Sequence, residues 1–457
     1  MKTGRKLVGG LVACVATLTV GAVMVLLPGA ANAGPAPTPL ALVVDTLVDN
    51  FDFDAADGLC DDGPDGDCSL REAVAVAAEN AGGGTVTFGV DGTVVLETEI
   101  VLEAGSDVTI TGNGVDKTIV TVEPPVKLFR GNGNEPRHFW VWQTDLTVED
   151  LTLRDGLARR GGSIYVAWQG ALTTENVHFL ENEAQEGGAI FADAENDTLD
   201  VRSTTFAGNQ AAVGGAIVVD NDTATVVNST FTANEAIVGA AIWVHWQGTL
   251  DISWSTFSGN VLVEEEQEQV EPAAFQGIRS SSAAQRGVFG PGGDAAIVAE
   301  VPGKGDGMAD VTISHSILEK TTGSNTGECS GPIVSGGANI VDDMSCGFVS
   351  ALDLEGTPAN VGPLQDNGGA TFTMALAADS AAVDVDTALC KLNDQRDLPR
   401  NTDGDGDGTD ACDSGAYELQ EESDEPTTTS TTAPDGGVDA DTATPARPTV
   451  ARPTFTG

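Results

Sequence analysis

Aspartates at alternate positions, followed by a glycine, lie near the end of the chain in the stretch NTDGDGDGTDACDSGAYE (401–418). Alternating carboxylates converge on one ion when the backbone curls around it, and calcium prefers such oxygen ligands. The twelfth position of this loop is Ser414, so Asp410, Asp413 or Glu418 must complete the site. The sequence predicts a Ca²⁺ site, with a solvated acidic turn as the alternative. The candidate ligands are Asp403, Asp405, Asp407, Asp410 and Asp413.

A second acidic stretch surrounds Cys60 and Cys68 near the start of the chain. By the same chemistry it could hold another calcium ion. Its carboxylates are those of Asp52, Asp54, Asp57, Asp61, Asp62, Asp65 and Asp67.

Three Trp-Gln pairs, beginning at Trp142, Trp168 and Trp246, form the second kind of candidate site. The interval from Trp168 to Trp246 is three times the interval from Trp142 to Trp168. This regular spacing predicts that the tryptophans share one wall of a repeating fold, where indole rings suit the apolar faces of sugars. The polar partners expected nearby are Glu195, Asp197 and His245. The alternative is a structural row of aromatic side chains that only shields the fold.

Catalytic residues are not singled out by the sequence. A lyase acting on uronates needs a base and cations, and the basic residues near the repeats are few: Arg154, Arg159, Arg160 and Arg202. A hydrolase needs two placed carboxylates, and 69 Asp and Glu residues are present. The histidines are scattered and are predicted to lie on the surface: His138, His178, His245 and His315.

The elements that must position these residues are internal repeats between 161 and 260. Each repeat contains a phenylalanine and, three residues later, an asparagine, and successive asparagines recur at a nearly constant interval. Short β-branched alternations broken by Gly, Asn and Asp predict three strands per repeat. We therefore expect a right-handed parallel β-helix of about 25–27 residues per coil. Three stacks of side chains are expected. The isoleucines and the phenylalanines each form an inward stack, and the asparagines form a third stack in left-handed turns, with hydrogen bonds from coil to coil. Their members are Ile164, Ile190, Ile217, Ile242, Phe179, Phe206, Phe231, Phe257, Asn182, Asn209, Asn234 and Asn260.

A β-helix needs caps, because its end coils expose strand edges and apolar core. Ser69 can cap a helix over 70–79, with Glu72 completing a capping box. Leu70, Val74 and Ala77 then share one face, which is expected to lie across the first coil.

The chain carries the features of an exported protein. Basic residues, an apolar run and Ala31-Asn32-Ala33 predict a signal peptide over 1–33. Leu11-Val12-Ala13-Cys14 resembles a lipoprotein box, but the apolar run continues past it. After cleavage no further apolar stretch is long enough to span a membrane. The net charge of −48 argues against a nucleic-acid partner.

Six cysteines follow the predicted signal peptide, an even number that favours disulfides in an exported chain. Six cysteines allow fifteen connectivities, and proximity in the sequence favours neighbouring pairs. Zinc is disfavoured because no histidine lies near a Cys-x-x-Cys. The favoured pairs are Cys60–Cys68, Cys329–Cys346 and Cys390–Cys412.

Two groups of motifs resemble known families. CSLREA (68–73), with the preceding acidic cysteine loop and VDTLVDN (44–50), resembles the CSLREA domain of bacterial exported β-helix proteins. The later motifs resemble a choice-of-anchor Q domain: SGGANIVDDMSC (335–346), GPLQDNGGATFTMAL (362–376), SAAVD (380–384), DQRDLPR (394–400) and CDSGAYE (412–418). The resemblance implies a secreted or surface-displayed parallel β-helix without a shared activity. The chain departs from it in having no LPxTG motif, and SAAVD lacks the usual following glycine.

The expected domains are a signal peptide (1–33), an N-terminal cap (42–83), a β-helix (84–375) with an excursion (262–309), a C-terminal cap (376–420) and a disordered Thr/Pro-rich tail (421–457). The expected function is that of a secreted or cell-surface binding or adhesion module, monomeric and stabilised by Ca²⁺. Its expected partner is an extracellular polysaccharide or a cell surface. The alternatives are a polysaccharide lyase or hydrolase and a purely structural envelope component.

Overall fold

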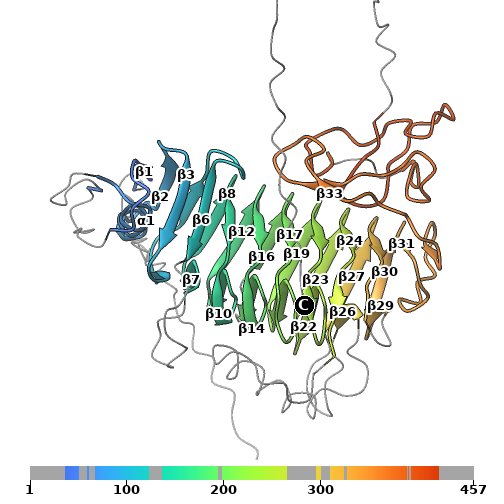
Figure 1. Ribbon diagram of the computed structural model, residues 1–457, viewed down its shortest axis with the longest axis horizontal. Coiled ribbons are helices and arrows are strands. Elements are labelled where there is room, and N and C mark those ends of the chain that lie inside the picture. Colours follow the sequence, from blue (N-terminus) through green and yellow to red (C-terminus); the bar gives the residue numbers. More distant parts are fainter. Residues whose placement is uncertain are drawn as a thin grey trace, which may run out of the picture.

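The chain folds into a parallel β-helix in the computed structural model, as the sequence predicts (Figure 1). The structure describes residues 37–50, 59–60, 67–122, 136–193, 198–264, 295–299, 309–323, 327–388, 390 and 393–420. The predicted signal peptide and the Thr/Pro-rich tail lie outside these residues. Within the described ranges no helix is both long and apolar enough to cross a membrane.

Three parallel sheets run the length of the β-helix. The first sheet contains, in spatial order, β1 (Leu40–Val44), β2 (Gly84–Phe88), β5 (Val108–Thr111), β8 (Asp145–Glu149), β12 (Ala171–Glu175), β16 (Thr198–Arg202), β19 (Thr223–Val227), β23 (Thr249–Ser253), β27 (Asp310–Ser314) and β30 (Ile333–Gly337). The second sheet contains β4 (Ile100–Glu103), β7 (Phe139–Trp142), β11 (Ile164–Ala167), β15 (Ile190–Asp193), β18 (Ile217–Asp220), β22 (Ile242–His245), β26 (Ala295–Ala299) and β29 (Gly327–Ser330).

The third sheet contains β3 (Gly92–Leu96), β6 (Thr118–Val122), β9 (Thr152–Arg154), β13 (His178–Leu180), β17 (Thr205–Ala207), β20 (Thr230–Thr232), β24 (Thr256–Ser258), β28 (Ile317–Glu319), β31 (Ile340–Val341) and β32 (Leu354–Glu355). Short pairs at the corners are β10 (Leu157–Arg160) with β14 (Glu183–Glu186), and β21 (Glu235–Ala236) with β25 (Val261–Leu262). The last coil ends at β32, so the β-helix stops before the expected residue 375. Within the expected excursion, β26 returns to the second sheet because its apolar sequence AAIVA fits a buried strand.

The predicted inward stacks are confirmed. Isoleucines 164, 190, 217 and 242 pair in register in the second sheet. The rings of Phe179, Phe206, Phe231 and Phe257 stack with centroid distances of 4.8, 4.6 and 4.5 Å. All eight side chains are almost entirely buried, so the repeat period sets the core.

The asparagines form the predicted ladder from coil to coil. The Nδ2 atoms of Asn182, Asn209 and Asn234 donate to the Oδ1 of the next asparagine at 2.9, 2.9 and 3.0 Å. The prediction of left-handed backbone at the asparagines was wrong, because the preceding residue takes that conformation in each coil. The φ values are 54, 67, 53 and 71° at Glu181, Gly208, Ala233 and Gly259. The following asparagine is thereby buried at the corner.

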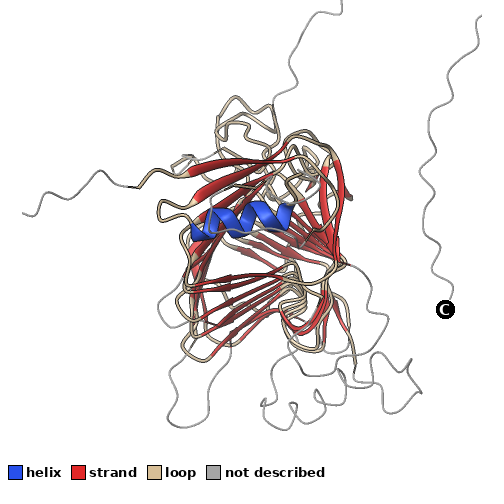
Figure 2. Cartoon of the chain, turned by 90° about the vertical axis from the view of Figure 1, so that its left-hand side faces the viewer, coloured by secondary structure: helices blue, strands red, loops and turns tan. Residues whose placement is uncertain are grey.

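The predicted capping helix is α1 (Leu70–Glu79), which crosses the open end of the first coil (Figure 2). Both bonds of the capping box between Ser69 and Glu72 are present. Leu70, Val74 and Ala77 are buried, as expected for the face on the core. Arg71 fixes the helix by donating to Asp49 at 2.8 Å. The three predicted disulfides, Cys60–Cys68, Cys329–Cys346 and Cys390–Cys412, are confirmed.

The C-terminal segment, of which residues 359–388, 390 and 393–420 are described, lies along the outer face of the third sheet (Figure 1). It contains the antiparallel pair β33 (Leu364–Gln365) and β34 (Thr373–Met374). Gln395 bonds to Thr205 and Thr230 on two neighbouring strands of that sheet. The segment expected as a C-terminal cap therefore covers the side of the β-helix.

Candidate functional site

The three tryptophans do not share one register. Trp142 pairs with Ala167, whereas Trp168 follows Ala167 at the turn after β11. Trp168 and Trp246 occupy equivalent left-handed turn positions, with φ values of 46 and 50°. The prediction of a shared register was wrong because the spacing of the tryptophans is not the length of the coil. The coil runs from Phe139 to its partner Ile164 and is one residue shorter than the interval from Trp142 to Trp168. Trp142 is one residue out of line as a result.

The tryptophans also differ in exposure. Trp168 is 69% exposed and Trp246 is 51% exposed, the two highest values among the tryptophans of this chain. Trp142 is partly buried and stacks on Trp140, with ring centroids 6.5 Å apart. Because β11 and β22 are three strands apart in the second sheet, Trp168 and Trp246 are separated by about 14 Å. Two indole surfaces, not three, are available to a ligand.

Two carboxylates lie on the strands between these indoles, and an imidazole lies beside Trp246. Asp193, Asp220 and His245 occupy the same outward position on β15, β18 and β22. His245 Nδ1 lies 3.3 Å from Asp220 Oδ1, and the imidazole stacks on Trp243 with centroids 4.4 Å apart. Trp168, Asp193, Asp220, His245 and Trp246 together are called the outer strip below.

Asp193 connects the outer strip to the side chains of Tyr165 and Arg160. Its Oδ2 accepts from Tyr165 Oη at 3.2 Å and from Arg160 Nη1 at 3.3 Å. Burial and the charge of Asp220 raise the pKa of the Asp193 carboxyl above its ordinary value.

Asp193 and Asp220 were not predicted from the sequence, although an aspartate three residues after the repeated isoleucine, in IFAD and IVVD, marks both. His245 was expected beside the tryptophans and lies there. Glu195 and Asp197, its expected companions, lie outside the described residues.

The remaining histidines are not on the surface, contrary to expectation. His138, His178 and His315 are 0, 4 and 5% exposed. Burial lowers the pKa of both His138 and His178 to about 4. His178 Nε2 accepts the Phe372 N–H at 3.0 Å, and His315 Nε2 lies 2.9 Å from Asp386. These imidazoles join the C-terminal segment to the β-helix or fill its corners. The scattered positions of the histidines in the sequence do not reveal these contacts, so the prediction of a surface location was wrong.

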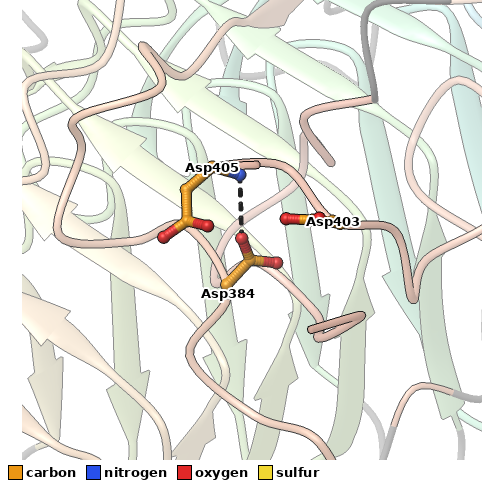
Figure 3. A group of neighbouring side chains, drawn as sticks. All are labelled: Asp384, Asp403 and Asp405. Atoms are coloured by element: carbon orange, nitrogen blue, oxygen red, sulfur yellow. Dashed lines mark hydrogen bonds between the residues drawn. The ribbon is translucent and has the colours of Figure 1, made fainter. Parts of the chain in front are cut away.

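The C-terminal aspartates gather only in part (Figure 3). Asp403 and Asp405 each offer an oxygen within 4.8 Å of one another and of Asp384, which was not predicted from the sequence. Asp384 lies well before Asp403 in the chain, outside any loop pattern. It joins the group because it accepts the N–H of Asp405 at 2.9 Å. Burial raises the pKa of the Asp384 carboxyl, and the charges of Asp403 and Asp405 add to the effect.

The other predicted calcium ligands lie elsewhere. Asp407 and Asp410 are exposed and do not belong to this group. Asp413 is fully buried, and its oxygens accept the N–H groups of Asp384 at 2.9 Å and Leu419 at 2.5 Å. Burial raises the pKa of Asp413 to about 7. Asp413 therefore supports the loop and does not belong to the carboxylate group.

Of the first acidic stretch only Asp67 lies within the described residues. Its Oδ1 accepts a hydrogen bond from Asn50 Nδ2 at 3.0 Å. The other six aspartates of that stretch lie outside the described residues, so the second calcium site stays a prediction.

Glu418, the other expected substitute ligand, belongs to a buried ion pair. Its Oε2 lies 3.3 Å from Arg400 Nη1, and both side chains are 0% exposed. Burial raises the pKa of Glu418 to about 8. The Arg400 guanidinium lies 4.5 Å from the Trp254 ring and donates to Asn228 at 3.0 Å, so it ties the C-terminal segment to the β-helix.

No family model matches the sequence, and no curated protein matches it. Among solved structures, the major allergen from cedar pollen, jun a 1, is similar over 69% of this chain and 76% of the allergen. The identity is 10% and the TM-score is 0.36.

Proposed function

We propose that the protein is an exported glycan-binding module whose binding surface is the outer strip. The observation that carries the proposal is the pair of exposed indoles, Trp168 and Trp246, with Asp193 and Asp220 on the two strands between them and His245 beside Trp246. Indole rings stack on the apolar faces of sugars, and carboxylate and imidazole groups bond to hydroxyls. Indoles three coils apart contact different rings of one oligosaccharide. The three disulfides support a location outside the reducing cytosol, at the cell surface or free in the medium.

Replacing Trp168 by alanine is expected to weaken glycan binding about tenfold, because one stacking surface of about 1.4 kcal/mol is lost. A glycan array followed by calorimetry on the best ligand measures the change. Trp246→Ala is expected to act in the same direction. Val349→Ala is the matched control, since Val349 is 95% exposed but lies near the last coil, away from the outer strip. Identical binding by the wild type and Trp168→Ala contradicts the proposal.

We also propose that Asp384, Asp403 and Asp405 hold a calcium ion that stabilises the C-terminal segment. Three carboxylates within 4.8 Å repel one another, and calcium relieves that repulsion while accepting their oxygens as ligands. The ion would contribute stability and geometry, with no part in catalysis.

Calcium is therefore expected to raise the melting temperature, and chelation with EGTA to lower it. At a calcium concentration one hundred times Kd the stabilisation is about 2.7 kcal/mol. Asp384→Asn is expected to abolish the shift seen by scanning fluorimetry. Asp251→Asn removes the same charge from an exposed position on β23 and serves as the control. Equal calcium shifts in both variants would refute this site.

A further inference from the structure

The centre of the outer strip carries two hydrogen-bond acceptors of negative charge, the carboxylates of Asp193 and Asp220. Asp193 and Asp220 lie on neighbouring strands at paired positions, about 4.8 Å apart along the β-helix axis. Asp193 uses Oδ2 for Tyr165 and Arg160, and Asp220 uses Oδ1 for His245. Within the described part of the chain, the second oxygen of each carboxylate accepts no hydrogen bond. Two acceptors thus remain between the indoles.

The cations beside the outer strip are already committed to acids. Arg160 Nε contacts Glu186 at 2.8 Å, its Nη1 contacts Asp193, and its guanidinium lies 4.7 Å from the Phe191 ring. Arg137, which lies 5.4 Å from the Tyr165 ring, contacts Glu99 at 2.6 Å. A sugar carboxylate bound here would lie next to Asp193 and Asp220, and both arginines would still be paired with acids of the protein. Its negative charge would therefore be repelled by the two aspartates.

An ammonium group fits this arrangement. It carries one positive charge and three donors, enough to bond to Asp193 and Asp220 at once. We propose that the outer strip selects glycans bearing free amino groups, such as de-N-acetylated hexosamine polymers, over N-acetylated and uronate polymers. This selectivity rests on the glycan binding proposed above, with Trp168 and Trp246 contacting the rings and the two aspartates contacting the amine.

The test compares three oligosaccharides of equal length by calorimetry: glucosamine, N-acetylglucosamine and galacturonate oligomers. The wild type is expected to bind the glucosamine oligomer at least tenfold more tightly than the acetylated one. Asp220→Asn keeps the shape of the side chain and is expected to remove most of that preference, because it weakens binding of the glucosamine oligomer far more than binding of the acetylated one. Asp251→Asn, on β23 of the first sheet, is the control of equal charge and should keep the full preference.

The outcomes separate the two proposals. Equal affinity of the wild type for the amino and acetylated oligomers, with binding still weakened in Trp168→Ala, overturns the amino-sugar selectivity and leaves the proposed glycan binding intact. No binding of any oligomer overturns both. Titrations are repeated with EDTA, and a preference that disappears with the chelator shows a metal ion between the aspartates and overturns the selectivity. Tighter binding of the galacturonate oligomer overturns it as well.

Discussion

Replacing Asn209 by alanine is expected to lower the free energy of unfolding by about 3 kcal/mol, because it opens the asparagine ladder at its centre. Asn209 Oδ1 accepts from both the backbone N–H and the Nδ2 of Asn182. Its Nδ2 donates to the Phe179 carbonyl and to Asn234. Asn182 and Asn234 are fully buried, so no water replaces these bonds. Equilibrium urea denaturation followed by circular dichroism measures the loss.

Asn113→Ala is the matched control for the ladder. Asn113 lies at the surface, and its Nδ2 makes an exposed bond to Asp91 at 2.8 Å. Its replacement is expected to change the free energy of unfolding by about 0.5 kcal/mol or less. If Asn209→Ala costs no more than this control, the ladder does not hold the coils together and the stability must come from the stacked phenylalanines and isoleucines alone.

The period of the repeats predicted the core of the β-helix, because identical residues at equivalent positions must stack when coils repeat. Phe179, Phe206 and Phe231 occupy the same position in successive repeats, and they pair in register in the third sheet. The coil between Trp142 and Trp168 is one residue shorter than the spacing of the two tryptophans, so they occupy different positions in their coils. A shift of one residue changes the face on which a strand residue lies. An average period therefore does not predict which residues stack. The length of each coil, taken between its own core residues, does.

The candidate sites were predicted less well, since they depend on contacts that the repeats do not encode. Asp193 and Asp220 could have been found by reading the outward positions of the strands, as they recur at one place in successive repeats. Asp384 could not, because an irregular turn brings it to Asp405. The same holds for Arg400, whose partner Asn228 is far away in the sequence. The Arg400 side chain is 0% exposed, which distinguishes it from the arginines on the surface, and only the folded chain reveals this burial.

Replacing Arg400 by methionine is expected to release the C-terminal segment from the β-helix at high pH but not at low pH. Burial raises the pKa of Asp413 to about 7 and that of Glu418 to about 8. At pH 9 both carboxyls are ionised, and removing the guanidinium leaves buried charges without their partner, at a cost of about 3–5 kcal/mol. At pH 5.5 both carboxyls hold protons, so the same change leaves no buried negative charge and costs far less.

In the wild type, too, Asp413 and Glu418 make the folded state less stable at high pH than at low pH. Carboxyls whose folded pKa lies above the unfolded value bind protons more tightly when folded. Their contribution to stability is therefore complete below the ordinary pKa of about 4 and is lost as the pH rises through 7 and 8. Hydrogen exchange of residues 393–420 at pH 5.5 and 9, corrected for the intrinsic rate, measures the release. Arg202→Met is the control, because the Arg202 side chain is 56% exposed in its pair with Asp200. A loss in Arg400→Met that does not depend on pH would mean that Arg400 acts through packing on Trp254, and that the buried carboxyls are not what it holds in place.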